Sequence, residues 1–368
     1  MLLPVLRMKN VDQMDILYFE FPISLLNRAD VVFTDASANT SEPPNFYSDP
    51  ADLVRLNWSE IDSLKWSSAN DILRHQRMAE VLVYSDLPVQ DAVRVVVWNE
   101  SKRKQVEELV TKAGVPFPAI EFASPERRHY FLKFMEGSRS SIVTGPKGIA
   151  RAYASACEQI RQKKGQQANA PFETLENLLE GLREDFACLP HTAELVGLES
   201  ENSFYRGTVD IDTLRVVQNL KTLRGFASLP REYQDHVELA AYLHDIGKGP
   251  KARWERNDGI QKVDPDHPVR AMPMMVEILT QQVRKAKQED AELILKLVCY
   301  HDLVDEVLGK GRDKQQIVDV AKTELELDML FALGRADATS LVKGSWDEDA
   351  AAALYNCCLA AIKARNDN

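Results

Sequence analysis

The feature that most constrains the fold is a helical spacing of apolar residues through the second half of the chain. Seven segments there repeat Leu, Ile, Val, Met and Ala three or four residues apart, which forms one apolar face on an α-helix. These segments cover residues 172–186, 212–223, 236–247, 272–283, 291–304, 324–342 and 350–362. We therefore predict an all-α helical domain over residues 172–368.

The first 122 residues follow a different pattern. Short runs rich in Val, Ile, Tyr and Phe alternate there with helix-type segments, which indicates a mixed α/β unit. The strand-type runs cover residues 16–21, 31–35, 81–86 and 92–98, and the helix-type segments cover residues 67–83 and 101–114. The chain as a whole is therefore predicted to be α+β, with a mixed α/β part at residues 1–122 and a helical part after it.

A basic segment separates the two halves. The chain has 368 residues and a formal net charge of −11, but residues 126–165 hold nine Lys or Arg and only three Asp or Glu. The sequence then runs into KKGQQANAP, which is typical of a loop, so we place a basic connector at residues 123–171. Its charges form either a solvated helix face or a strip that contacts phosphates, with Tyr130, Phe131 and Phe134 as core or stacking groups.

Composition excludes several classes of protein. The chain is 45% hydrophobic and 27% charged, as in soluble globular proteins. The opening MLLPVLRMK lacks the features of a signal peptide, and no apolar run approaches the roughly 18 residues of a membrane span. Five cysteines form no CxxC pair. We expect a cytoplasmic protein without a membrane partner, whose acidic charge confines any nucleic-acid contact to a local patch.

Adjacent His244 and Asp245 end an apolar helix in the segment LAAYLHDIGKGP. Burying both side chains is costly unless a partner compensates them, and a divalent metal accepts an imidazole nitrogen together with a carboxylate oxygen. Gly247 suits the end of a helix. The pair therefore indicates a metal site, and the alternative is a structural histidine at a helix end.

The HDIGK sequence, with further ligand types downstream, resembles the HD superfamily of metal-dependent phosphohydrolases. The resemblance implies one or two divalent ions (Mn, Mg or Fe) and a nucleotide or phosphate-ester substrate. It implies a catalytic role for Lys248, which would contact a substrate phosphate. The metal ligands that it implies are His244, Asp245, His267, His301 and Asp337.

The first ligand position departs from the family pattern. The family has a histidine there that opens a helix of the form His-x-x-x-Val, whereas this chain has Asp212 in DIDTLRVVQNL. An aspartate replaces a neutral ligand by an anionic one and favours oxygen-preferring ions such as Mn or Mg. We include Asp212 among the metal ligands, with His191 as a second candidate. A site that binds metal without turnover is the alternative to an active one.

Residues 1–122 resemble a second family, the DarT-type DNA ADP-ribosyltransferases. The matching motifs are FTD at 33–35, FYSD at 46–49, DL at 52–53, Trp58 and the block RHQRMAEVLV at 74–83. Met78 stands in that block where the family often has Gln. The resemblance covers only the C-terminal part of the family's domain. The segment that supplies an NAD-binding His and a catalytic Arg is expected to precede Met1.

This second resemblance makes Glu80 the catalytic carboxylate, which contacts the nicotinamide ribose of NAD while ADP-ribose is transferred to a base in single-stranded DNA. It makes Thr34, Asp35 and Arg77 substrate-binding residues and the loop from Asp35 to Tyr47 a substrate-contacting loop. NAD is an expected cofactor only when the upstream segment is present. Without the resemblance, Glu80 is an ordinary surface glutamate.

Three functions follow from these observations. The first is a metal-dependent phosphohydrolase of the HD superfamily fused to an N-terminally truncated DarT-like domain. The second is an NAD-dependent, toxin-type transferase acting on single-stranded DNA, with the HD domain as a regulatory or reversing module. The third is a non-catalytic, metal-stabilised binding module fused to an inactive transferase fragment.

Overall fold

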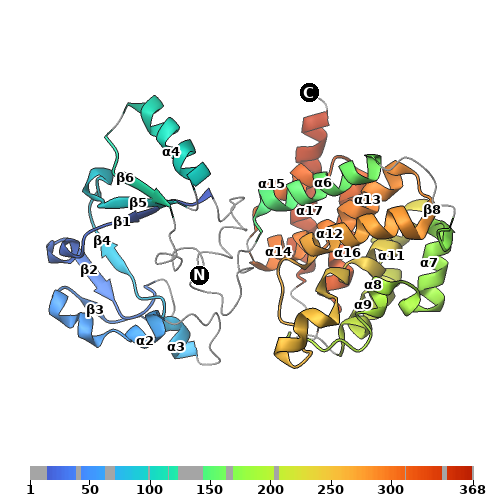
Figure 1. The fold of residues 1–368 in the computed structure, drawn as a ribbon, viewed down its shortest axis with the longest axis horizontal. Helices are drawn as coiled ribbons and strands as arrows, with labels where there is room; N and C mark the ends of the chain where they lie inside the picture. Colours follow the sequence, from blue (N-terminus) through green and yellow to red (C-terminus); the bar gives the residue numbers. More distant parts are fainter. Residues whose placement is uncertain are drawn as a thin grey trace. The chain divides into compact units, whose positions relative to one another are not determined.

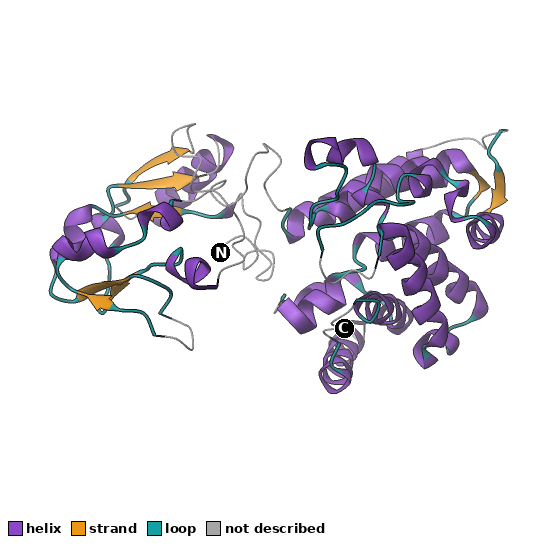
Figure 2. Ribbon diagram, turned by 90° about the horizontal axis from the view of Figure 1, so that it is seen from below, coloured by secondary structure: helices purple, strands orange, loops and turns teal. Residues whose placement is uncertain are grey.

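The computed structural model falls into two compact units, with Thr144 as the first described residue of the second (Figure 1). The first unit mixes strands with helices, whereas the second is almost entirely helical, as the colouring in Figure 2 shows. This confirms the predicted α+β class. The described residues are 15–38, 43–62, 71–97, 100–114, 116–122, 144–162, 169–202, 207–310, 312–341 and 346–366.

Two three-stranded sheets organise the N-terminal unit. In the first sheet, β5 lies between its antiparallel partner β1 and its parallel partner β6. In the second sheet, β2 lies between β3 and β4, and both pairings are antiparallel. The strands are β1 (Tyr18–Glu20), β2 (Val31–Thr34), β3 (Phe46–Tyr47), β4 (Val81–Val83), β5 (Arg94–Val97) and β6 (Ala119–Phe122); the helices are α2 (Trp58–Ile61), α3 (Asp71–Gln76) and α4 (Glu100–Ala113).

The apolar residues of β2 and β5 hold these sheets in place. Val95, Val96 and Val97 of the central strand β5 are fully buried, as expected for a strand covered on both faces. Phe33 of β2 stacks on Tyr47 of β3 at 5.5 Å between ring centroids. The pairing of β2 with β4 brings the residues that follow Phe33 beside the start of β4.

The second unit is a bundle of helices around α11. The helices α7, α9, α13 and α16 all pack against α11, and its last eight residues are buried. The helices are α6 (Pro146–Gln162), α7 (Leu175–Glu184), α8 (Pro190–Ala193), α9 (Val209–Thr222), α10 (Arg224–Ala227), α11 (Arg231–Leu243), α12 (His267–Glu277), α13 (Gln288–Cys299), α14 (Leu303–Lys310), α15 (Gln315–Val320), α16 (Glu324–Ala338) and α17 (Glu348–Asn366). One short parallel pair, β7 (Phe172–Thr174) and β8 (Val283–Lys285), joins them.

Part of the predicted basic connector belongs to this bundle. Helix α6 packs on α12 and α13 and buries Ile149, Ala156 and Cys157 in the core of the unit. Arg161 at its end forms an ion pair with Glu292 of α13 at 2.7 Å. A basic residue of the segment is therefore used within the fold. The predicted stacking group of Tyr130, Phe131 and Phe134 lies outside the described residues.

The predicted helical segments in the second half all contain helices, with three local differences. Residues 172–174 and 283–285 form β7 and β8, because their main chains pair with each other as parallel strands instead of extending the neighbouring helices. The segment 291–304 forms two helices, since α13 ends at Cys299 and α14 begins at Leu303. In the first half, the segment 67–83 yields the short helix α3 followed by β4.

Among the described residues, no helix is long and apolar enough to cross a membrane.

Glu238 links three helices of the bundle. Its buried carboxylate on α11 accepts hydrogen bonds from Arg183 of α7 at 2.9 and 2.7 Å and lies 2.8 Å from the ammonium of Lys221 of α9. We expect Glu238→Gln to lower the free energy of unfolding by about 1.5–3 kcal/mol at pH 7, because charge-assisted hydrogen bonds are lost. Urea unfolding followed by far-UV circular dichroism measures the change, and exposed Glu255→Gln is the matched control.

The same contact predicts a pH dependence. Burial raises the pKa of Glu238, but Arg183 and Lys221 outweigh burial and hold it below its ordinary value of 4.5. A carboxyl whose folded-state pKa is lowered stabilises the fold above its unfolded pKa and loses this effect as the pH falls through the folded value. The difference between the parent and Glu238→Gln is therefore expected to shrink below about pH 4.5. A difference that is constant with pH would contradict this.

Candidate functional site

The candidate metal ligands lie at the ends of packed helices in the second unit. His244 directly follows α11, and Asp245 is the residue immediately before the short 3₁₀ helix Ile246–Lys248. His267 is the first residue of α12, and His301 lies two residues beyond α13. Because α11, α12 and α13 pack together, ligands that are 57 positions apart in the sequence meet at one place.

The three histidine side chains share one hydrogen-bonding pattern. In each case Nδ1 contacts the main-chain carbonyl three residues earlier: His244 contacts Ala241 at 2.7 Å, His267 contacts Asp264 at 2.7 Å, and His301 contacts Val298 at 2.9 Å. A carbonyl can only accept, so Nδ1 carries the N–H that donates. Each ring therefore keeps Nε2 for a ligand, which is the arrangement that metal-binding histidines use.

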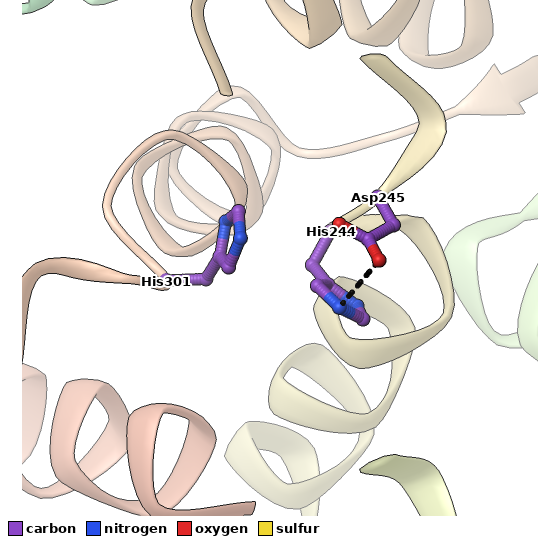
Figure 3. Close-up of side chains that lie close together, drawn as sticks. All are labelled: His244, Asp245 and His301. Atoms are coloured by element: carbon purple, nitrogen blue, oxygen red, sulfur yellow. Dashed lines mark ion pairs between the residues drawn. The ribbon is translucent and has the colours of Figure 1, made fainter. Parts of the chain in front are cut away.

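The Nε2 atoms converge with the carboxylate of Asp245. His267 Nε2 lies 3.0 Å from His301 Nε2 and 3.3 Å from Asp245 Oδ1. His244 Nε2 lies 3.4 Å from Asp245 Oδ2, the contact that is dashed in Figure 3, and His301 faces this pair from the opposite side. Two imidazole lone pairs at 3.0 Å repel each other unless a cation lies between them. The donor set of imidazoles and a carboxylate therefore fits a divalent transition metal.

Charge in the cluster is strongly coupled. Burial lowers the pKa of His244, but the carboxylates of Asp245 and Asp337 outweigh burial and raise it to about 9. Burial and the neighbouring His244 lower the pKa of His301 to about 4. The carboxylates thus attract positive charge to His244, while His301 stays neutral and able to ligate.

Two neighbours hold Asp245 and its segment in position. Lys248 is buried, and its ammonium donates to Asp245 Oδ2 at 2.5 Å. Gly247 lies so close to α12 that an added Cβ would be 1.9 Å from the carbonyl oxygen of His267. The 3₁₀ helix that follows Asp245 can therefore touch the start of α12 only because residue 247 has no side chain.

Asp264 is a supporting residue that the sequence analysis did not identify. Its carboxylate accepts from Arg253 at 2.7 Å and from Arg270 at 2.9 Å, while its carbonyl orients His267. Two arginines thus fix the turn that aims one imidazole. The sequence signal was an acidic residue three positions before a histidine, which is too common to be informative.

The remaining ligand candidates lie around this cluster. Asp337 on α16 is partly exposed, and its Oδ1 is 3.7 Å from His244 Nε2. Asp212 on α9 is buried, with one carboxylate oxygen 2.9 Å from Arg215 and the other 3.2 Å from the Ser340 hydroxyl. Burial and the carboxylates of Asp245 and Asp337 raise the pKa of Asp212.

His191, the second candidate for the first ligand position, has another neighbour. It lies on α8, and its Nε2 is 3.5 Å from Glu277 at the far end of α12 from His267. Among the described residues, the group with ligand atoms close enough for one ion here contains His244, Asp245 and His301. Short contacts therefore connect five of the six predicted ligands, namely His244, Asp245, His267, His301 and Asp337. The sixth, Asp212, is coupled to them by charge, and the alternative candidate His191 lies elsewhere.

In the N-terminal unit, Glu80 lies where β2 and β4 are paired. Its carboxylate accepts from the Ser37 hydroxyl at 3.1 Å and from the main-chain N–H of Ala38 at 3.4 Å. Thr34 is fully buried, and its hydroxyl donates to Ala36 and accepts from the main-chain N–H of Glu80. Thr34 thus positions Glu80 against the start of the predicted substrate loop.

The other two predicted substrate-binding residues have partners within the unit. Asp35 accepts from the main chain and side chain of Asn45 at 3.0 and 2.7 Å and from the Tyr47 hydroxyl at 3.2 Å. These bonds join the two ends of the predicted substrate loop. Arg77 is partly buried, and its guanidinium forms an ion pair with Glu60 of α2 at 2.9 Å.

Comparison with known protein families agrees with both resemblances. Residues 210–321 match the HD domain family, and residues 1–131 match the family described as ssDNA thymidine ADP-ribosyltransferase, DarT. The chain thus carries a DarT domain followed by an HD domain. HD domains are in general metal-dependent hydrolases that bind divalent metals.

Three solved structures of DarT from Thermus sp. 2.9 are similar to part of the chain. They are the complexes with carba-NAD+, with ADP-ribosylated ssDNA and with NAD+; each is 22% identical over 25% of this chain, with TM-scores of 0.23, 0.24 and 0.24. The match covers 47%, 44% and 46% of those chains, so this chain spans less than half of their length. No curated protein matches the chain.

Proposed function

We propose that the helical unit is a metal-dependent phosphohydrolase that acts on a nucleotide or another phosphate ester. The observation that carries this proposal is the shared orientation of three imidazoles, each held by a carbonyl at Nδ1 and each directing Nε2 toward the others and Asp245. A structural histidine at a helix end needs no such convergence, whereas a metal ligand does.

His244, Asp245, His267 and His301 would hold one or two divalent ions, with Asp337 at the exposed side. When bound, such ions polarise a phosphoryl oxygen and supply hydroxide near neutral pH. Asp212, paired with Arg215, lies beside the ligands, and its hard carboxylate oxygen at the first position favours Mn or Mg over softer ions. Fe is the further candidate.

Lys248 has a positioning role as well as its predicted catalytic one. Its contact with Asp245 neutralises one carboxylate oxygen and leaves the other beside His267. Contact with a substrate phosphate would require the ammonium to share its donors between the carboxylate and the phosphate, which three N–H groups allow.

Removal of metal is the direct test of this function. We expect the purified chain, supplied with Mn2+, to hydrolyse at least one member of a panel of nucleoside mono-, tri- and cyclic phosphates. Chelation with EDTA should abolish the reaction, and Mn2+ should restore it. Tight metal binding without hydrolysis of any member would instead favour the third function, a metal-stabilised binding module.

A second candidate function belongs to the N-terminal unit, and the position of Glu80 favours it. NAD-dependent transfer of ADP-ribose to thymidine in single-stranded DNA needs a carboxylate near the developing oxocarbenium ion. Glu80 is fixed at a strand end by Ser37 and Thr34 and stays partly exposed. In this proposal the chain is of toxin type, and the HD domain regulates or reverses the modification.

Replacement of Glu80 tests this second function. In a version of the chain that also carries the segment expected to supply the NAD-binding His and the catalytic Arg, we expect labelling of a thymidine-containing single-stranded oligonucleotide from NAD. Glu80→Gln in that parent should reduce labelling by at least about 100-fold, because the charge that stabilises the transition state is lost. Exposed Glu108→Gln on α4 is the matched control. Equal labelling by the parent and Glu80→Gln would reject the role of Glu80, and no labelling by the parent would reject the activity.

We further propose domain limits at residues 1–122, 123–171 and 172–368, with α6 of the connector packed against the helical domain, and a location in the cytoplasm. The cytoplasmic location is supported by five cysteines that all remain free thiols.

A further inference from the structure

A second group of metal-ligand residues lies at the opposite ends of the helices that lead to the HD cluster. Glu232 and His236 are in the first half of α11, and Asp290 is in the first turn of α13. They line a surface cavity of about 950 Å³ together with residues of β7, β8 and α7. Neither family resemblance involves these three residues.

The geometry places one ligand atom of each residue near the others. Glu232 and His236 are four positions apart, so they share one face of α11. One ligand atom from each of Glu232, His236 and Asp290 can be chosen so that all lie within 4.8 Å of one another. His236 Nε2 is 4.0 Å from Asp290 Oδ1, which is too long for a hydrogen bond.

His236 is a buried imidazole in which one ring nitrogen, Nδ1, has no hydrogen-bond partner among the described residues. The residue is 6% exposed, and Nδ1 itself is buried. A buried polar group without a partner costs free energy. Burial also lowers the pKa of His236, so the ring is neutral and has a lone pair to offer. Tyr233 packs edge-on against the ring and limits its rotation.

The carboxylates of this group already attract a cation. The ammonium of Lys287 lies 3.1 Å from Glu232 and 3.8 Å from Asp290. The Lys287 side chain is 75% exposed, so it can move into solvent at little cost. A divalent ion would satisfy the same carboxylates and could also bind the imidazole nitrogen, for which no contact with Lys287 is seen.

We propose that Glu232, His236 and Asp290 form a second metal site, separate from the HD cluster, for a divalent transition-metal ion such as Zn2+. One imidazole and two carboxylates are ligands that Zn2+ accepts at about 2.0–2.2 Å, with ligand atoms roughly 3.4 Å apart in a tetrahedron. Rotation of the Glu232 and Asp290 side chains would shorten the distances between ligand atoms from up to 4.8 Å to this value. The fourth position then faces the cavity and is open to water or a small ligand.

Such an ion would join the beginnings of α11 and α13. The same two helices end beside His244 and His301, so the ion would restrain the pair of helices that positions the HD cluster. The second site shares no ligand with the HD cluster. The proposal is therefore independent of whether the chain hydrolyses phosphate esters.

The test is zinc stoichiometry in a chain whose HD cluster is disabled. Full-length protein with Asp245→Ala is saturated with Zn2+, dialysed and subjected to elemental analysis. We expect His236→Ala to lower the zinc content by one ion per chain, and Asp290→Asn to do the same while preserving side-chain size. Glu289→Gln, an exposed neighbour in the same turn, should leave the content unchanged.

Co2+ substitution gives a second measurement. The absorption bands of tetrahedral Co2+ should appear with Glu289→Gln and be lost with Asp290→Asn. Equal zinc content in all variants would overturn the proposal. It would also be overturned if inorganic phosphate, without Zn2+, stabilised the chain against thermal unfolding and His236→Ala removed that effect, because the cavity would then be an anion site.

Discussion

Replacing both His244 and Asp245 by alanine is expected to abolish metal binding at the HD cluster and to lower hydrolysis of phosphate esters by at least about 1000-fold. The size follows from the several kcal/mol that a bound ion contributes to charge stabilisation, since each 1.36 kcal/mol corresponds to a factor of about 10 in rate. Both side chains are buried at the centre of the cluster, so no other described residue can take their place without movement of α11.

Two further variants separate loss of the site from loss of the fold. His301→Gln removes one imidazole from a different helix end and should give the same loss of metal and activity. His191→Ala removes a histidine that contacts Glu277 instead of the cluster, and it should keep both. Elemental analysis and the nucleotide panel measure the outcome. Full activity in the double variant would reject the assignment, and metal loss in His191→Ala would make His191 a ligand.

The sequence predicted which residues form the candidate metal site better than it predicted the contacts that hold those residues in place. His244 and Asp245 could be identified because adjacent imidazole and carboxylate groups at the end of an apolar helix are costly without a partner. His301 was predicted only through the resemblance to the HD superfamily. The carbonyls that orient the rings could not be identified, because every residue has one and only the backbone geometry selects it. Likewise, Arg215 beside Asp212 lies one helical turn away, where an ion pair is common on any helix.

The second group shows why some sites escape sequence patterns. Glu232 and His236 lie on an amphipathic helix whose polar positions are normally solvated, and Asp290 belongs to a segment 54 positions later. Only the packing of α11 on α13 brings the three together and buries the imidazole.

Short strands are missed by sequence patterns for a related reason. The strands β3 and β7 have two and three residues, too few for a period of two to be recognised.

Among the described glycines of the helical unit, Gly247 is the one whose replacement by alanine is expected to have the largest effect. The new Cβ would lie 1.9 Å from the carbonyl oxygen of His267 and 2.8 Å from the main-chain nitrogen of Ala271. Both are backbone atoms at the start of α12, so no side-chain rotation relieves the clash. Moving the 3₁₀ helix away from α12 would separate Asp245, two residues earlier, from His267.

We therefore expect Gly247→Ala to lower the free energy of unfolding of the helical unit by about 3 kcal/mol, at the upper end of overpacking, and to weaken metal binding at least about 10-fold in the molecules that fold. Urea unfolding and metal titration measure the two effects. Gly225→Ala is the matched control, because its added Cβ meets no atom within 4 Å. Parent-like stability and metal affinity in Gly247→Ala would show that α12 does not hold the 3₁₀ helix this closely. The contact between Asp245 and His267 would then have to depend on two other side chains that bind this turn. Lys248 donates to the Asp245 carboxylate, and Arg253 donates to the carbonyl of Gly247.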